Sequence, residues 1–488
     1  MINKSNNRVT SGLIWRLLER FGAEIVTFIV SIVLARLLEP SVYGIVAIIT
    51  AITAILTVFV DGGFPNALIQ KKDSNSADFS TVFWFNLIAS FFLYACLFCF
   101  APLIASIYEN DLLTPVIRVL GLIIIIAAFK SIQQTYIRKT MQFKKFFFAT
   151  MFGTIGAAVI GIYMAVNGFG VWALVAQYLF NSLVDTIALW ISTKWRPSFV
   201  FDSKSFKGLF SYGWKFLASS LLDTGFVELR SFIIGKRYTS EDLAFYNRGR
   251  QLPNMIITNV NTSINSVLLP AMSEVQDNVL RVKEMTRRSL KVGSFIVWPA
   301  MIGMCVCAEP IILLLLGEKW LFAVPYLQIF CIIYAFYPIS TANLNAIKAL
   351  GRSDVFLVLE IAKKAVGLLI ILISMWFGVF WIAIGALVSS VFGQIINSWP
   401  NKKLLHYSYL EQIKDIVPYI LVSLFMGIIV FSISVLSLPY WVLLSIQVPL
   451  GIFVYFALSF MLKLDSFDYC MNSFKNFLNS RKKERHTL

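Results

Sequence analysis

Long runs of apolar residues alternate with short polar segments along almost the whole chain. A helix that crosses a membrane needs about 20 mostly apolar residues, and the runs reach this length again and again. The pattern predicts an all-α membrane protein with about fourteen transmembrane helices. We place them near residues 12–38, 41–66, 79–106, 113–134, 146–166, 170–192, 208–235, 243–272, 290–315, 322–347, 354–376, 379–398, 416–436 and 440–463.

Polar residues recur inside several of these runs at the spacing of one helical face. The eighth run carries the fullest set, which consists of Asn247, Arg250, Asn254, Thr258, Asn261 and Asn265. The second run carries a shorter set, which ends in Thr57 and Asp61. Polar groups within a membrane usually face the bundle interior, a partner charge or water. We therefore expect a polar cavity inside the bundle, and hydrogen bonds between helices remain the alternative interpretation.

Charged residues inside the runs suggest what such a cavity binds. A guanidinium group stays protonated and binds phosphate through two hydrogen bonds, so arginines within the membrane suit an anionic ligand. The candidate arginines are Arg118, Arg230, Arg248 and Arg250. The acidic candidates either balance these charges or bind a coupling proton or sodium ion; they are Glu24, Asp61, Asp185 and Asp223.

Charge and composition support a membrane topology. The chain is 58% hydrophobic and 14% charged, with a formal net charge of +16. Most of the 42 lysines and arginines fall in alternate loops, which is the positive-inside pattern. This alternation predicts an even number of spans with both termini in the cytoplasm, and it argues against a nucleic-acid partner because the cations do not share one soluble face. The first run carries Arg16 and Glu19, so we expect a retained helix and not a cleaved signal peptide.

Enzymatic chemistry finds little support in the sequence. There are six cysteines and two histidines, and most of the cysteines lie inside apolar runs. We expect no catalytic residues, no metal site and no cofactor, and we find no phosphate-binding GxxxxGK[ST] motif. The loops on the non-cytoplasmic side are short, which argues against a membrane-embedded glycan polymerase with a catalytic loop there.

A weak internal repeat divides the chain. Trp15 and Glu24 match Trp214 and Asp223, and Thr57 matches Asn261 at a similar offset. An even number of helices separates the paired elements, so the halves would be parallel repeats. We expect an N-terminal lobe at 1–200, a C-terminal lobe at 201–405, each of six helices, two further helices at 406–465 and a basic tail at 466–488.

Six short stretches resemble the polysaccharide (Wzx-type) flippases of the MOP exporter superfamily, in family order along nearly the whole chain. They are 34–48, 61–73, 138–145, 268–278, 317–329 and 345–354. The resemblance implies a MOP- or MATE-like fold, similar to the exporters of colanic-acid or teichuronic-acid type. It also implies a flippase in the bacterial inner membrane that moves undecaprenyl-diphosphate-linked oligosaccharide repeat units by alternating access, for O-antigen, capsule or exopolysaccharide assembly.

The partners implied by the resemblance are the lipid-linked oligosaccharide, membrane lipids, a coupling H⁺ or Na⁺, and the polysaccharide polymerase machinery. Two other substrates stay open within the same superfamily, namely the peptidoglycan lipid precursor and small drugs. Arginines in the cavity and the number of spans disfavour drugs, whereas only the resemblance disfavours the peptidoglycan precursor.

Overall fold

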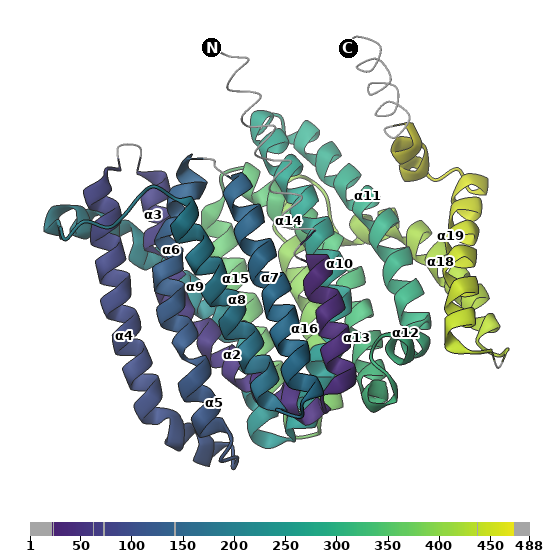
Figure 1. Ribbon diagram of the computed structural model, residues 1–488. Coiled ribbons are helices and arrows are strands. Elements are labelled where there is room, and N and C mark those ends of the chain that lie inside the picture. Colours follow the sequence, from purple (N-terminus) through teal and green to yellow (C-terminus); the bar gives the residue numbers. More distant parts are fainter. Residues whose placement is uncertain are drawn as a thin grey trace, which may run out of the picture. The chain divides into compact units, whose positions relative to one another are not determined.

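The computed structural model describes residues 22, 24–61, 63–71, 74–140, 143–436 and 438–472, and within these ranges every regular element is a helix (Figure 1). Contacts divide the chain into two compact units, Met1–Ala244 and Phe245–Leu488. In the first unit, residues 24–37 are helical. They are followed by α2 (Pro40–Asp61), α3 (Phe64–Gln70), α4 (Ser76–Ile107), α5 (Leu113–Leu120), α6 (Leu122–Thr140), α7 (Phe143–Val166), α8 (Val171–Ser192) and α9 (Ser203–Arg237).

The core of the first unit is one hydrophobic cluster shared by most of its helices. Leu34, Ile49, Phe83, Ile117 and Val175 are all buried in it. These residues come from five separate helical segments, so each apolar run contributes one face to a common interior. Burying a large aliphatic or aromatic side chain stabilises a water-soluble fold by about 1.5–3 kcal/mol, but in lipid the gain comes mainly from close packing.

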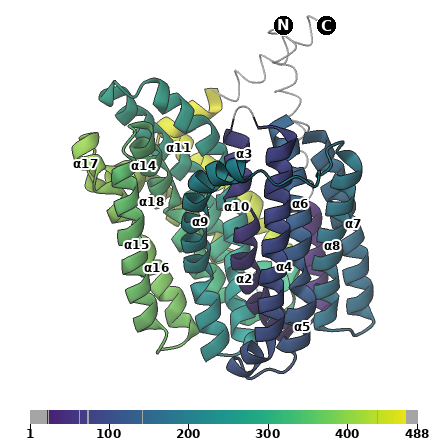
Figure 2. The same cartoon turned by 90° about the vertical axis from the view of Figure 1, so that its left-hand side faces the viewer.

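Helix α2 lies beside α9 within this unit (Figure 2). Gly44, near the start of α2, allows the backbone at Ser240 to approach this helix closely. A Cβ atom on Gly44 would lie 1.7 Å from the carbonyl oxygen of Ser240. Small residues allow backbones to approach in this way in membrane bundles. The approach fixes the start of α10 (Ser240–Glu274) against α2.

Residues 193–202 form an extended segment between α8 and α9 that is tied to α4. The indole Nε1 of Trp84 donates to the carbonyl oxygen of Ser198 at 2.9 Å, and the backbone N–H of Asp202 donates to Thr81 Oγ1 at 3.0 Å. The segment is visible in Figure 2 as the thin loop that runs to the start of α9. These bonds place the first turn of α9 beside the first turns of α4.

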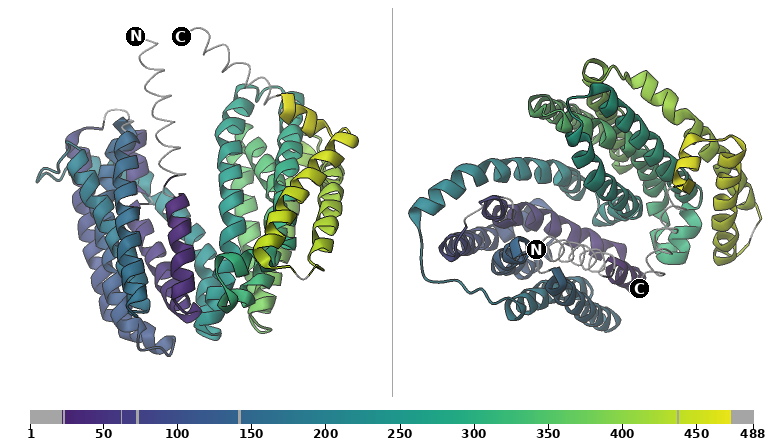
Figure 3. Two further views of the ribbon diagram at one scale, coloured as in Figure 1. Left: turned by 45° about the vertical axis from the view of Figure 1, so that its right-hand side comes forward. Right: turned by 90° about the horizontal axis from the view of Figure 1, so that it is seen from above.

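The second unit continues α10 and adds the remaining helices. They are α11 (Val279–Val306), α12 (Ala308–Leu315), η1 (Glu318–Ala323), α13 (Val324–Ala335), α14 (Tyr337–Ala349), α15 (Ser353–Ser374), α16 (Val379–Ser398), α17 (Asn401–Leu404), α18 (Tyr409–Ile433) and α19 (Tyr440–Met461). Helices α18 and α19, yellow in Figure 3, pack with α11 around Phe295, Tyr419, Met426 and Tyr455.

A buried polar network fixes α14 from one side. The amide nitrogen of Asn343 donates to Gln412 Oε1 at 2.7 Å, and Asn401 Nδ2 donates to Asn343 Oδ1 at 2.6 Å. All three residues are fully buried. Because a buried amide without partners is costly, this arrangement specifies how α14 sits against α17 and α18.

The fold confirms an all-helical, multi-pass membrane protein. Among the described residues, nine helical stretches are long and apolar enough to cross a membrane. Helices α9, α10 and α15 coincide in sequence with further predicted runs but are not among the nine. Charged or polar residues interrupt α9 and α10. The count of about fourteen spans, the parallel repeat and the lobe boundary near residue 200 therefore stay predictions. The contact-based division falls instead after Ala244, so that α9 belongs with the first unit.

Candidate functional site

The polar stripe of α10 forms hydrogen bonds with α14 at its C-terminal half. Thr341 Oγ1 donates to Asn261 Oδ1 at 3.0 Å, and Asn345 Nδ2 donates to Asn265 Oδ1 at 2.6 Å. Each helix contributes two residues spaced four apart, so the bonds repeat once per turn. We call this pairing the α10–α14 ladder. For these two asparagines the structure favours the interhelical alternative, while Asn254 has an exposed side chain.

Arg248 and Arg250 lie two residues apart on α10 and thus point to different sides of the helix. The Arg248 side chain is 9% exposed, its guanidinium carbon is 5.4 Å from the ring centre of Trp320, and Nη1 donates to Gln251 Oε1 at 2.6 Å. Arg248 is therefore part of the packing of the second unit. Arg250 shares its face with Asn247 and Asn254, is half-buried, and makes no side-chain bond with the residues that the structure describes.

Gly249 brings this part of α10 against α13. A Cβ atom on Gly249 would lie 2.5 Å from Tyr326 Cβ and 2.7 Å from the backbone nitrogen of Leu327. One turn further on, Pro253 interrupts the hydrogen bonding inside α10. The close approach holds Arg248 on the α13 side of the helix and leaves Arg250 on the stripe.

The two arginines of the first unit differ from each other as well. Arg118 on α5 packs over Phe98 at 4.3 Å and donates through Nε to the Phe98 carbonyl oxygen at 3.4 Å. Arg230 on α9 lies 5.9 Å from the ring of Phe226, and its buried Nε has no hydrogen-bond partner among the described residues. A buried donor without a partner is destabilising, so Arg230 is the better candidate for binding an anion.

Two of the four acidic candidates, Asp61 and Asp185, lie near one lysine. Lys130 Nζ on α6 lies 3.3 Å from Asp185 Oδ2 on α8. Asp61 lies beside Ser131, with Lys130 and Arg138 as nearby cations. The other Asp185 oxygen, Oδ1, is buried without a partner in the described part of the chain, as is Asn181 Oδ1. The structure therefore brings Asp61 and Asp185 to a common cation.

Sequence reasoning missed Lys130 as a site residue. Lys130 lies inside the predicted run 113–134, and its position within an apolar helix was the available signal. The remaining candidates are less informative. Thr57 Oγ1 donates to the carbonyl oxygen of Ala54 in its own helix at 3.0 Å, Glu24 is half-buried, and Asp223 is exposed on α9.

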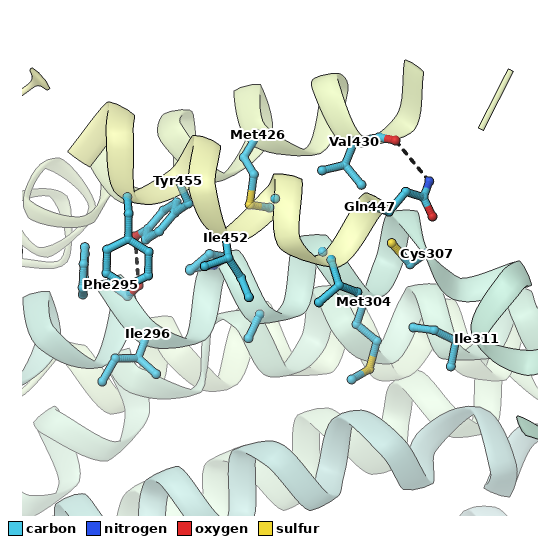
Figure 4. A pocket seen from close by; sticks show the side chains of 16 residues that line it. Phe295, Ile296, Met304, Cys307, Ile311, Met426, Val430, Gln447, Ile452 and Tyr455 are labelled. Atoms are coloured by element: carbon cyan, nitrogen blue, oxygen red, sulfur yellow. Dashed lines mark hydrogen bonds between the residues drawn. The ribbon is translucent and has the colours of Figure 1, made fainter. Parts of the chain in front are cut away.

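An apolar groove in the second unit was not anticipated from the sequence. It has a volume of about 440 Å³ and is lined by α11, α12, α18 and α19 (Figure 4). Two polar side chains on its wall are hydrogen-bonded within the protein, although Gln447 Oε1 is buried without a partner among the described residues. Gln447 Nε2 donates to the carbonyl oxygen of Val430 at 3.1 Å, and the Tyr455 hydroxyl donates to that of Phe295 at 2.8 Å. The groove therefore offers methyl, methylene, sulfur and ring surface to whatever enters it.

Two glycines could have signalled this groove. Gly303 on α11 and Gly451 on α19 both line it. A Cβ atom on Gly303 would meet only Met426 Cε, at 3.9 Å, so its side of the groove is open. Glycines are common in transmembrane helices, however, and nothing in their spacing distinguishes a groove from a close helix contact.

Comparisons with known proteins place the chain by family. Residues 33–325 match the model of a family described as polysaccharide biosynthesis protein. The teichuronic acid biosynthesis protein TuaB of Bacillus subtilis (strain 168) is 26% identical, over 78% of this chain and 80% of its own length. The lipopolysaccharide biosynthesis protein WzxC of Escherichia coli (strain K12) is 24% identical, over 81% of this chain and 83% of its own length.

Solved structures show the same fold. The lipid II flippase MurJ in an inward closed conformation superposes with a TM-score of 0.79 at 15% identity, covering 93% of this chain and 99% of that protein. An inward-facing multidrug resistance MATE transporter of the MOP superfamily gives a TM-score of 0.60 at 16% identity, covering 80% of this chain and 98% of that protein. The expected MOP- or MATE-like fold is thus confirmed.

The chain belongs to the polysaccharide biosynthesis protein family, and its fold is that of membrane transporters.

Proposed function

We propose that this member of the family is a flippase that moves undecaprenyl-diphosphate-linked oligosaccharide repeat units from the inner to the outer leaflet of the bacterial cytoplasmic membrane. The product would supply O-antigen, capsule or exopolysaccharide assembly. The observation that supports it most is the apolar groove in a protein of a polysaccharide biosynthesis family. Such a substrate has a long polyprenyl tail, and the groove offers that tail a mostly apolar surface.

Arg230 in the first unit and Arg250 in the second are each a proposed contact for an anionic group such as the diphosphate. Each lacks an ion-pair partner among the described residues, and each is at least half-buried. A guanidinium group in a low-dielectric environment binds phosphate strongly and cannot lose its proton. The polar face of α10 beyond the ladder, with Asn247 and Asn254, would contact the sugars.

The mechanism that we propose is alternating access between two lobes, with both termini in the cytoplasm. The sites around Lys130 are the proposed location of ion coupling, because Asp185 and Asn181 hold acceptor oxygens without donors. A proton or sodium ion would satisfy these oxygens in one state of the transport cycle. Lys130 would then act as the internal cation that competes for the same carboxylates.

Deletion of the gene tests the proposal. We expect the polyprenyl-diphosphate-linked repeat unit to accumulate in the cytoplasmic leaflet and the surface polymer to be lost, with both restored by the wild-type gene. Unchanged surface polysaccharide would contradict a role in its export. Accumulation of the peptidoglycan lipid precursor instead would assign the protein to that substrate.

Two substitutions at one position test the groove separately. Gly303→Leu fills open space, so we expect it to lower surface polymer at least tenfold while membrane abundance is unchanged. Gly303→Ala adds a single methyl group and is the matched control. It should retain export and gain about 0.4–1 kcal/mol in stability, because alanine restricts the unfolded chain. Wild-type export in Gly303→Leu would exclude the groove as the tail site.

A further inference from the structure

A second cavity lies in the first unit, where α3, α4 and α9 begin or end. It has a volume of about 440 Å³, within the roughly 300–1,000 Å³ range of small-molecule sites. Its charged lining residues are two lysines and two aspartates, namely Lys71, Lys204, Asp78 and Asp202. The lining thus has no net charge, in contrast to the strongly basic chain as a whole.

One of the two charge pairs is fully engaged within the protein. Asp78 is 1% exposed and lies 2.8 Å from Lys71 Nζ. The same carboxylate accepts from the backbone N–H of Asn75 at 2.9 Å and from the hydroxyl of Ser205. This set of bonds links α3, α4 and α9 and gives the cavity a fixed wall.

The second charge pair is available to a ligand. Lys204 is exposed and its ammonium group makes no ion pair with a residue that the structure describes. Asp202 uses Oδ1 to cap α9, accepting from the backbone N–H of Lys204 at 2.9 Å, and its other carboxylate oxygen has no partner within the described ranges. One free cation and one free anionic oxygen therefore line the same cavity.

This pairing complements a zwitterion that carries a phosphate and a primary ammonium group. The phosphate would bind Lys204, and the ammonium would donate to Asp202. A quaternary amine has no N–H to donate, so it would lose the second contact. An anionic headgroup without an amine would leave Asp202 unpaired and facing a negative charge.

Apolar surface beside the cavity indicates that the zwitterion belongs to a lipid. Phe201 is 51% exposed, Phe210 45% and Trp214 48%. Phe201 precedes Asp202 in the chain and Phe210 follows Leu209, and both Asp202 and Leu209 line the cavity. Tryptophan and tyrosine concentrate where lipid headgroups meet the hydrocarbon core, so Trp214 supports this placement, and the two phenylalanines add apolar surface beside it. Lys139 and Lys207 near this end of the unit are consistent with the cytoplasmic side in the proposed orientation.

We propose that the cavity between α3, α4 and the start of α9 binds the headgroup of phosphatidylethanolamine from the cytoplasmic leaflet. The choice of leaflet rests on the proposed orientation, but binding does not depend on which glycan the protein transports. The bound lipid would join the first turn of α9 to α3 and α4. Phosphatidylethanolamine is then a structural ligand of the unit and not cargo.

Binding is measured on the purified full-length chain by native mass spectrometry from detergent, with phosphatidylethanolamine, phosphatidylcholine and phosphatidylglycerol of identical acyl chains. We expect phosphatidylethanolamine to bind roughly tenfold more tightly than phosphatidylcholine, since one charge-assisted hydrogen bond is worth about that factor. The two variants Asp202→Asn and Lys204→Gln should each remove this preference. Asparagine caps a helix as well as aspartate does, so Asp202→Asn keeps α9 intact.

Lys207→Gln is the matched control, because Lys207 is exposed on the same helix and does not line the cavity. It should bind as the wild type does. Equal binding of phosphatidylethanolamine and phosphatidylcholine, or wild-type preference in both cavity variants, would overturn the proposal. Tighter binding of phosphatidylglycerol would assign the site to anionic lipids instead. Export measured in the same variants reports on transport separately, so a failure of the flippase proposal is distinguishable.

Discussion

Between α6 and α8 the polar contact is an ion pair with unfilled acceptors, whereas between α10 and α14 it is a ladder of neutral groups. Lys130 and Asp185 are 3.3 Å apart, and Asp185 Oδ1 remains buried without a donor in the described part of the chain. In the ladder, Asn261 and Asn265 each accept one bond, at 3.0 and 2.6 Å, and none of its four residues has a buried unpaired side-chain atom.

The difference separates two uses of polar residues in a membrane bundle. A ladder of neutral groups holds two helices in register at modest energy, because each group could find other partners in the unfolded protein. Removing one member of a charged pair destabilises the protein, because the remaining ion is then buried without a partner. Acceptors left without donors beside such a pair are where a mobile cation would bind, which is why we place coupling there and packing in the ladder.

The largest effect is expected from breaking the ion pair. Lys130→Met leaves Asp185 and Asp61 without their shared cation, and we expect the protein to lose about 3 kcal/mol of stability, at the lower end for buried pairs because Lys130 is partly exposed. The measurement is the free energy of unfolding in mixed micelles. The double variant Lys130→Met/Asp185→Asn should recover part of the loss, because residue 185 is then neutral and only Asp61 keeps its charge. If Lys130→Met were as stable as the wild type, the ion pair would make no contribution to stability.

A smaller effect is expected in the ladder. Asn345→Leu removes the donor to Asn265, and we expect a loss of about 1–2 kcal/mol, the range for interhelical bonds in membranes. A double-mutant cycle with Asn265→Leu should give a coupling energy of about 0.6 kcal/mol. Ser266→Ala is the control, because the Ser266 hydroxyl bonds only within α10, to the carbonyl oxygen of Ser263. Zero coupling would mean that the two asparagines are stabilised independently, contrary to the ladder.

The sequence was sufficient to predict the helices but not their partners. A run of about 20 apolar residues has few alternatives to a helix in lipid, because backbone groups must be bonded internally. The partner of Asn265 is Asn345, eighty positions away, and no local pattern reports a contact at that distance. The spacing of the α10 stripe places its polar residues on one face, yet it could not distinguish the residues that bond to α14 from those that do not.

The groove and the partners of Lys130 could not be predicted from the sequence, for related reasons. The groove exists because four helices leave space between them, and each wall residue alone looks like an ordinary lipid-facing residue. Lys130 lies inside an apolar run, and no local pattern shows which carboxylate it faces. Only the position of α8 beside α6, with Asp185 at the contact, gives Lys130 its ion-pair partner.

The smallest effect on stability is expected from Thr57 on α2, a helix that belongs to neither of the two polar contacts compared above. The hydroxyl of Thr57 on α2 bonds only to Ala54 in its own helix, at 3.0 Å, so Thr57→Val removes no contact between helices. We expect the free energy of unfolding to change by less than about 0.5 kcal/mol, because valine keeps the shape and fits a membrane helix. If the α2 face lines the proposed passage, export of the polymer should fall in this variant although stability does not. Asn345→Leu should show the reverse, with lower stability and export in proportion to the folded protein. Equal loss of stability in both variants would mean that the threonine stripe packs against another helix, and the distinction between a packing face and a passage face would then be wrong.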